Sequence, residues 1–298
     1  MKAPLFSGTG VALVTPFRRG QDTIDFTKFD SLIEHIVTSG VDYIVALGTT
    51  SEAATMTENE RSAVQEFIVE TVNNRIPVML GLGGNNTLNL TDTIARTNFD
   101  GISGLLSVTP YYNKPNQRGL LAHYRAVAEA APVPVVIYNV PGRTGVNLTA
   151  ETTLTLAHEC PNIIGIKEAS GNMQQIMEIL RQRPQGFRVI SGDDALTFPM
   201  LTLGADGVIS VIANALPKEM STMVKLTLKG DCKKALPMHY SMLPLMNAIF
   251  EEGNPTGIKA LLEIEGLITN ALRMPLVKAS KQLYNKLTLL YNEFRGQA

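Results

Sequence analysis

Short apolar runs recur along the first two thirds of the chain, and segments with helical spacing separate them. Eight runs rich in β-branched residues occur in order: Val11–Thr15, Tyr43–Leu47, Val78–Leu82, Leu105–Thr109, Val135–Asn139, Ile163–Lys167, Arg188–Ser191 and Val208–Ile212. Apolar strands that alternate with amphipathic helices are typical of a parallel sheet whose outer face is covered. Eight such units over roughly 230 residues favour an α/β fold of the (β/α)8 TIM-barrel type. A doubly wound sheet is the alternative, but it does not require eight repeats.

Two of the intervening segments carry clear helix boundaries. Thr57 and Glu60 form the capping-box pattern, which predicts a helix from Arg61 to about Val72. A second helix is predicted over Phe29–Val37. It stops at Gly40, since glycine is the usual residue just past a helix end.

The strand pattern ends after Pro217, and residues from Asp231 onward have helical spacing. Breaks in these helices are predicted at Pro244, at Gly253-Asn254-Pro255 and at Arg273-Met274-Pro275. The chain is therefore expected to divide into a catalytic barrel domain at residues 1–230 and a C-terminal helical domain at residues 231–298.

Composition narrows the class of protein. The formal net charge is −1 and no long basic run occurs, so nothing marks a nucleic-acid-binding surface. Cys160 and Cys232 make neither a disulfide framework nor a CxxC motif. The N-terminus lacks the long apolar core of a signal peptide, and no uncharged apolar stretch is long enough to span a bilayer. A soluble cytoplasmic protein without nucleic-acid or membrane partners is expected.

Lys167 ends the sixth apolar run, and it is the only lysine between Pro115 and Pro217. Burial lowers the pKa of an amine, and a neutral amine is a nucleophile toward carbonyl carbon. The sequence therefore predicts a Schiff-base lysine. The alternative is a strand-end lysine that points into water.

The other predicted strand ends supply further candidates, because the active site of a (β/α)8 barrel lies at the carboxyl ends of its strands. Taken singly, each candidate has an ordinary explanation. Tyr138 can be a core aromatic, Thr49 and Thr50 can cap a helix, and Arg143 can be a solvated loop charge. Together these strand ends bring an amine, phenols, hydroxyls and a guanidinium to one mouth of the barrel. The candidate residues there are Thr49, Thr50, Tyr112, Tyr138, Arg143, Lys167, Gly192 and Ile209.

Metal and cofactor chemistry has little support in the sequence. Asp193-Asp194 can be a metal pair, but no histidine lies nearby, and helix capping is favoured. Gly81-Leu82-Gly83-Gly84 lacks the Lys-Ser/Thr of a P-loop and the full dinucleotide fingerprint, so it predicts a tight turn. No metal and no cofactor are expected. The histidines fall in helix-like stretches without ligand spacing: His35, His123, His158 and His239.

Six motifs occur in order along nearly the whole chain: GTTSE, VTPYYNKP, YNVPGRTG, GIKEAS, SGDD and GVISV. Together they resemble the dihydrodipicolinate synthase / N-acetylneuraminate lyase family of class I aldolases. Thr49, Thr50 and Arg143 resemble the synthase branch, because the sialic-acid lyases typically have Ser-Thr in the first motif and no such arginine.

The resemblance implies catalytic roles for four residues. Lys167 would form an imine with pyruvate, and Tyr138 would be the general acid/base. Thr49 would relay protons between Tyr138 and the partner subunit's Tyr112. The resemblance also implies a homotetramer built as a dimer of dimers.

The resemblance implies binding roles for the remaining candidates. Thr50, Gly192 and Ile209 would contact pyruvate, and Arg143 would bind the carboxylate of L-aspartate-4-semialdehyde, in lysine and diaminopimelate biosynthesis. Carbonyl chemistry agrees with these roles. An imine is an electron sink, so the methyl group of pyruvate can lose a proton and attack the aldehyde, and a nearby phenol can move that proton. A guanidinium grips a carboxylate through two parallel hydrogen bonds.

The first motif departs from the family pattern, because Ser51 stands where glycine is usual. Glycine adopts a positive φ at little cost and serine does not. The geometry of the loop beside Thr50 is therefore left open by the sequence.

A second departure concerns the family's feedback site for lysine. Asn85 and Tyr111 match its lysine-binding positions, whereas Glu58 and Asn89 stand where lysine-sensitive enzymes often have a histidine and a glutamate. Without the acidic partner an incoming lysine cation loses an attraction, so weak or absent inhibition by lysine is predicted.

Two other functions are compatible with parts of this pattern. Another pyruvate-dependent aldolase or lyase would act on a sugar acid or a hydroxyproline-derived substrate, and Arg143 argues against it. A non-catalytic barrel that binds pyruvate would have no use for the complete set of lysine, tyrosine, threonine and arginine.

Overall fold

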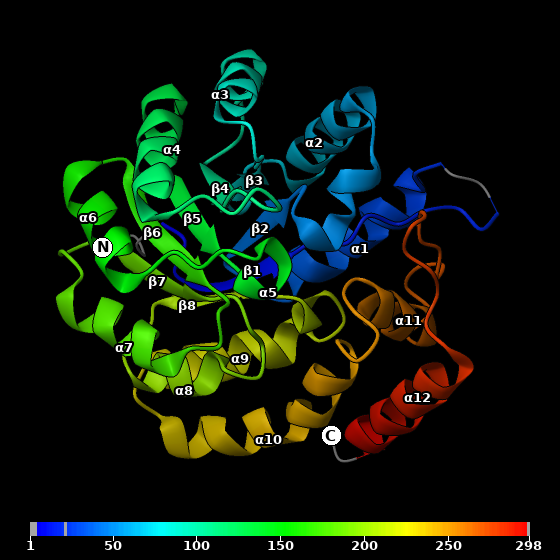
Figure 1. Cartoon of the computed structure of the whole chain (residues 1–298). Helices are drawn as coiled ribbons and strands as arrows, with labels where there is room; N and C mark the ends of the chain where they lie inside the picture. Colours follow the sequence, from blue (N-terminus) through cyan, green and yellow to red (C-terminus); the bar gives the residue numbers. More distant parts are fainter. Residues whose placement is uncertain (1–4, 21–22, 297–298) are drawn as a thin grey trace.

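The computed structural model describes residues 5–20 and 23–296, and in them eight parallel strands close into a barrel (Figure 1). The first strand pairs with both the second and the eighth, so closure removes the sheet edges. The predicted (β/α)8 barrel is confirmed. The strands are β1 (Gly8–Ala12), β2 (Tyr43–Ala46), β3 (Val78–Gly81), β4 (Gly104–Val108), β5 (Val135–Asn139), β6 (Ile163–Glu168), β7 (Arg188–Ser191) and β8 (Gly207–Ser210).

The eight predicted runs match these strands, with shifts at the first and the last. β1 begins before its predicted start at Val11, because its opening residues include two glycines that interrupt the apolar pattern. Gly10 is needed there, since a Cβ at this position would lie 2.2 Å from the Tyr43 ring. Ile212, predicted in the last strand, instead begins the short helix η3 (Ile212–Asn214).

Helices follow the strands around the outside of the barrel. The predicted capping box is confirmed, because Thr57 and Glu60 satisfy each other's backbone N–H groups at the start of α2. The first helix ends just before Gly40, which has a φ of +82°, as predicted. The helices of this part are α1 (Phe26–Thr38), η1 (Thr49–Ser51), η2 (Ala53–Thr55), α2 (Glu58–Val72), α3 (Thr87–Arg96), α4 (Gln117–Ala130), α5 (Pro141–Thr144), α6 (Ala150–Glu159), α7 (Met173–Gln182), α8 (Thr197–Thr202) and α9 (Pro217–Leu228).

The last part of the chain is helical, as predicted, and contains α10 (Cys232–Ala248), α11 (Thr256–Ile264) and α12 (Lys281–Gly296). The predicted breaks after α10 and after α11 are confirmed. The predicted break at Pro244 is wrong, because α10 continues through both Pro237 and Pro244. Both prolines lie on the exposed side of the helix, where water can solvate the carbonyl groups that they leave unpaired.

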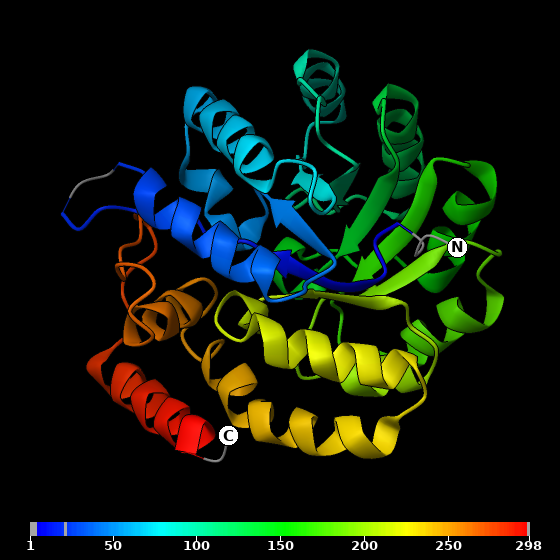
Figure 2. The same ribbon diagram turned by 180° about the vertical axis from the view of Figure 1, so that it is seen from behind.

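The C-terminal helices lie together along one side of the barrel (Figures 1 and 2). α10 packs against α8, α9 and α12, and α11 packs against α12 and η3. A domain boundary at residues 230 and 231 stays a prediction, and this position falls between α9 and α10. Of the helices described, none has both the length and the apolar composition needed to cross a membrane.

Candidate active site

A cavity of about 800 Å³ opens at the carboxyl ends of the strands. The C-terminal part of the chain contributes to its wall through Met246 of α10 and through Asn254 and Leu276 of the connections that follow α10 and α11. Tyr112 and Ile209 are not among the residues that line it. The other six predicted site residues all line this one cavity: Thr49, Thr50, Tyr138, Arg143, Lys167 and Gly192.

Lys167 lies near the end of β6 and is buried, with 6% of its surface exposed. Its Nζ lies 4.2 Å from the centroid of the Tyr138 ring. Among the residues that the structure describes, no carboxylate lies within ion-pair distance of it. Burial lowers the pKa of Lys167 to about 7, Asp194 opposes this shift and Arg143 adds to it. In a large fraction of the molecules, Lys167 is therefore a free amine at neutral pH.

Gly192 follows β7 and lies directly against the lysine side chain. A Cβ at this position would lie 3.0 Å from Lys167 Cε and 2.7 Å from the Cβ of Ala169. Glycine therefore gives the amine the room that it occupies.

Tyr138 lies opposite Lys167 in the pairing of β5 with β6. Burial raises the pKa of its phenol, while the Arg143 charge and a hydrogen bond with Thr49 lower it. The phenol stays protonated at neutral pH, so it can donate a proton beside an amine that is partly neutral. This pair of groups suits proton transfer during imine formation.

The loop that carries Thr49 and Thr50 is bounded by two residues in the left-handed region. Leu47 has a φ of 53° and Glu52 a φ of 61°, which are uncommon values for residues other than glycine. Such backbone strain is concentrated at functional sites. Ser51 itself is not one of the positive-φ residues in the described part of the chain. It ends η1, and its Oγ donates to the Gly48 carbonyl at 2.7 Å.

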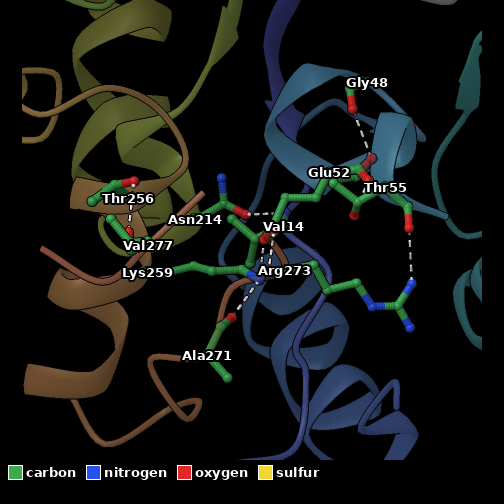
Figure 3. A network of polar contacts seen from close by, with 11 residues as sticks. Val14, Gly48, Glu52, Thr55, Asn214, Thr256, Lys259, Ala271, Arg273 and Val277 are labelled. Atoms are coloured by element: carbon green, nitrogen blue, oxygen red, sulfur yellow. Dashed lines mark hydrogen bonds and ion pairs between the residues drawn. The ribbon is translucent and has the colours of Figure 1, made fainter. Parts of the chain in front are cut away.

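A buried polar network anchors this loop to the C-terminal helices (Figure 3). Glu52 forms a fully buried ion pair with Lys259 of α11 and accepts a hydrogen bond from the main-chain N–H of Arg273 at 3.0 Å. Lys259 also donates to the Ala271 carbonyl at 2.9 Å. The Arg273 guanidinium reaches back to the Thr55 carbonyl, 3.2 Å away. Sequence reasoning missed this network, although the lysine within the apolar stretch Thr256–Ile264 was a signal.

Arg143 lies in the single-turn helix α5, at the mouth of the cavity. It is exposed, and its Nη2 donates to the main-chain carbonyl of Asn254 at 3.3 Å. The Asn254 side chain donates to Thr50 Oγ1 at 2.9 Å. One residue between α10 and α11 therefore contacts two predicted substrate-binding residues.

The two predicted residues outside the cavity differ in their surroundings. Tyr112 has a φ of 73° and is 87% exposed, so its phenol lies away from the site of its own chain. Ile209 is buried in β8, and Val211, just beyond it, lines the cavity.

The aspartates after β7 act as capping groups. Asp193 accepts hydrogen bonds from the N–H groups of Ala195 and Leu196, in the turn that precedes α8. Asp194 accepts from the N–H groups of Val211 and Ile212, where η3 begins. Within the described ranges, no group of three or more His, Cys, Asp or Glu side chains could hold a metal ion.

Comparisons with known proteins identify the family of the chain. The model of the "Dihydrodipicolinate synthetase family" matches residues 5–293. The chain belongs to this family. It is 49% identical over 280 residues to the 4-hydroxy-tetrahydrodipicolinate synthase of Parabacteroides distasonis, and the match covers 94% of each protein.

Crystal structures of family members have the same fold. The dihydrodipicolinate synthase of Aquifex aeolicus has a TM-score of 0.93 and 40% identity, with 97% of this chain and 98% of that chain covered. The chloride-inhibited synthase of Acinetobacter baumannii, complexed with pyruvate, has a TM-score of 0.94 and 38% identity over 97% of this chain and 99% of that one.

Two of the positions that the sequence predicted to bind lysine contact each other in this chain. Asn85 Nδ2 donates to the Tyr111 carbonyl at 3.1 Å. Glu58 begins α2, Asn89 lies in α3, and both are exposed.

Proposed function

We propose that this chain is a 4-hydroxy-tetrahydrodipicolinate synthase, a lyase that condenses pyruvate with L-aspartate-4-semialdehyde in lysine and diaminopimelate biosynthesis. The observation that carries the proposal is a buried amine that has no carboxylate partner among the described residues. It lies 4.2 Å from the ring centroid of a protonated phenol, in a cavity large enough for two small substrates. The family membership and the 49% identity to a synthase of that name support the same reaction.

The first half of the reaction uses Lys167 and Tyr138. The neutral Lys167 amine attacks the keto carbon of pyruvate, and Tyr138 supplies the proton with which the oxygen leaves as water. The resulting imine draws electrons from the adjacent methyl group, so that loss of a methyl proton gives an enamine. A pKa of about 7 suits this lysine, because the free amine is then abundant near neutral pH.

The second half uses the mouth of the cavity. The enamine carbon attacks the aldehyde carbon of aspartate-4-semialdehyde, while Arg143 holds that substrate's carboxylate. The substrate's own amine then attacks the imine carbon and displaces Lys167, which closes the ring and restores the free lysine. Thr50 and Gly192, which line the cavity, contact the pyruvate-derived part. A contact from Ile209 stays a prediction, because this residue is buried in β8 and is not among those that line the cavity.

The proton relay requires a second copy of the chain. Thr49 hydrogen-bonds Tyr138 and would pass protons to the partner subunit's Tyr112. The exposed, strained Tyr112 supports this assignment, since its phenol does not serve its own cavity. We propose a homotetramer built as a dimer of dimers, in which each such pair of chains completes two sites. A cytoplasmic location stays a prediction.

Reductive trapping tests the central assignment. Borohydride added with pyruvate should leave a pyruvate adduct on Lys167, located by mass mapping, and Lys167→Ala should lose both the adduct and turnover. The control is Lys229→Ala, which removes an exposed lysine at the end of α9. An unmodified Lys167, or wild-type turnover in Lys167→Ala, would refute the proposed function.

Inhibition by lysine should be weak or absent, because Glu58 and Asn89 do not supply the family's histidine and glutamate pattern. Steady-state rates at increasing lysine concentration test this, and clear inhibition below millimolar lysine contradicts it.

A further inference from the structure

Asn254 bridges the two groups that receive substrate carboxylates. It lies in the connection between α10 and α11 and is 7% exposed. Its side chain contacts Thr50 and its main chain contacts Arg143. These two contacts are chemically independent, because one uses the amide and the other the backbone carbonyl.

The direction of the side-chain hydrogen bond determines what Thr50 can do. A hydroxyl has one proton to donate and lone pairs to accept with. Asn254 Nδ2 donates to Thr50 Oγ1 at 2.9 Å, which occupies an acceptor position. Among the residues that the structure describes, none accepts a hydrogen bond from this hydroxyl. Its proton is therefore free for a ligand in the cavity, and a donor on its oxygen polarises it further.

The contribution of the Asn254 amide to stability does not by itself explain why an asparagine is at this position. Its Oδ1 is buried and has no hydrogen-bond partner among the described residues. A buried polar atom that lacks a partner is destabilising, and such atoms in native structures have specific explanations. An amide donor aimed at Thr50 is an explanation that concerns the site.

We propose that Asn254 is a positioning residue, which fixes the Thr50 hydroxyl as a hydrogen-bond donor to the carboxylate of pyruvate. The inference rests on the proposed function. It makes the C-terminal part of the chain a determinant of pyruvate affinity, separate from the contact that it makes with Arg143.

The test compares Asn254→Ala with Asn254→Asp. The alanine variant loses the donor but keeps the main-chain carbonyl, so KM for pyruvate should rise about fivefold to tenfold while KM for the aldehyde stays within about twofold. The nearly isosteric aspartate variant places an acceptor beside Thr50, which draws the hydroxyl proton away from the ligand and adds a repelling charge. KM for pyruvate should then rise by about a hundredfold. Asn292→Ala, an exposed asparagine of α12, is the matched control and should be unchanged.

A double-mutant cycle separates positioning from general loosening. In a Thr50→Val background the hydroxyl is gone, so adding Asn254→Ala should change KM for pyruvate by less than about twofold. Additive losses, equal rises in both KM values, or an unchanged KM in both Asn254 variants would overturn the inference. Borohydride trapping of the wild-type protein with pyruvate distinguishes failure of this inference from failure of the proposed function. If Lys167 is not trapped there, the proposed function itself is wrong.

Discussion

Two lysines are buried in the described part of the chain, and they differ in their surroundings. Lys167 Nζ lies 4.2 Å from the centroid of the Tyr138 ring, and Lys259 Nζ lies 4.2 Å from that of Phe17. Burial lowers both pKa values, to about 7 for Lys167 and about 8 for Lys259. Lys259 has an ion-pair partner in Glu52 and does not line the cavity at the barrel mouth, whereas Lys167 lines that cavity and has no carboxylate within ion-pair distance among the described residues.

The comparison shows that a lowered pKa alone does not identify a reactive amine. The hydrogen bonds of Lys259 to Glu52 and to the Ala271 carbonyl occupy two of the three protons of its ammonium group, and the side chain is fully buried. Lys167 keeps a lone pair available beside open space. Lys259 holds the loop in place, and Lys167 is the amine that we propose carries out the chemistry next to that loop.

The largest stability effect should come from Lys259→Met. This change leaves the Glu52 carboxylate buried without its cation, which typically destabilises a protein by about 3–5 kcal/mol. Urea unfolding at pH 7 measures the difference. The double variant Lys259→Met/Glu52→Gln removes the stranded charge and should recover a large part of the loss. A single variant as stable as wild type would show that the pair does not anchor the loop.

Lys167→Met, unlike Lys259→Met, is expected to increase the free energy of unfolding. The folded-state pKa of Lys167, about 7, lies below its ordinary value of 10.5, so between these pH values the unfolded state binds more protons. The wild-type protein therefore carries a stability penalty that is full below pH 7 and disappears as pH rises to 10.5. Methionine removes this penalty, so the variant should be more stable by about 2–4 kcal/mol at pH 7.

The measurement for Lys167→Met is urea unfolding of both proteins at pH 7 and at pH 10. The advantage of the variant should shrink at the higher pH. An advantage that is independent of pH would mean that packing, and not the desolvated charge, sets the difference.

The same titration should appear in catalysis. The rate of imine formation requires the neutral amine, so kcat/KM for pyruvate should rise about tenfold per pH unit below pH 7 and level off above it. Asp194→Asn removes an anion that raises the pKa of Lys167, and the profile should move to lower pH. A profile that continues to rise toward pH 10 would contradict the lowered pKa.

The contrast between the two lysines also shows what one sequence can reveal. Lys167 was predictable, because it ends an apolar strand and the strand order of a barrel places that end at the reactive mouth. The Lys259 pair was not, because its partner Glu52 is 207 positions away and no local pattern joins them. The helix break predicted at Pro244 was wrong for a related reason. Whether a proline breaks a helix depends on which side faces water, and tertiary packing decides that.

Ser51 lies between Thr50, which lines the cavity, and Glu52, which pairs with Lys259. A substitution at this position tests whether the family's glycine is required there. The left-handed conformation falls on Glu52 instead, so serine costs no backbone strain at its own position. Its Oγ donates a hydrogen bond to the Gly48 carbonyl at 2.7 Å, and this bond stabilises η1, the short helix that carries Thr49 and Thr50. Ser51→Gly should lose this bond and gain freedom in the unfolded chain, with a loss of about 1 kcal/mol in thermal or urea unfolding. KM for pyruvate should change by less than about twofold, because the hydrogen bond from Asn254 still holds Thr50. A glycine variant with greater stability and a clearly altered KM would show instead that the serine distorts the loop beside the lysine.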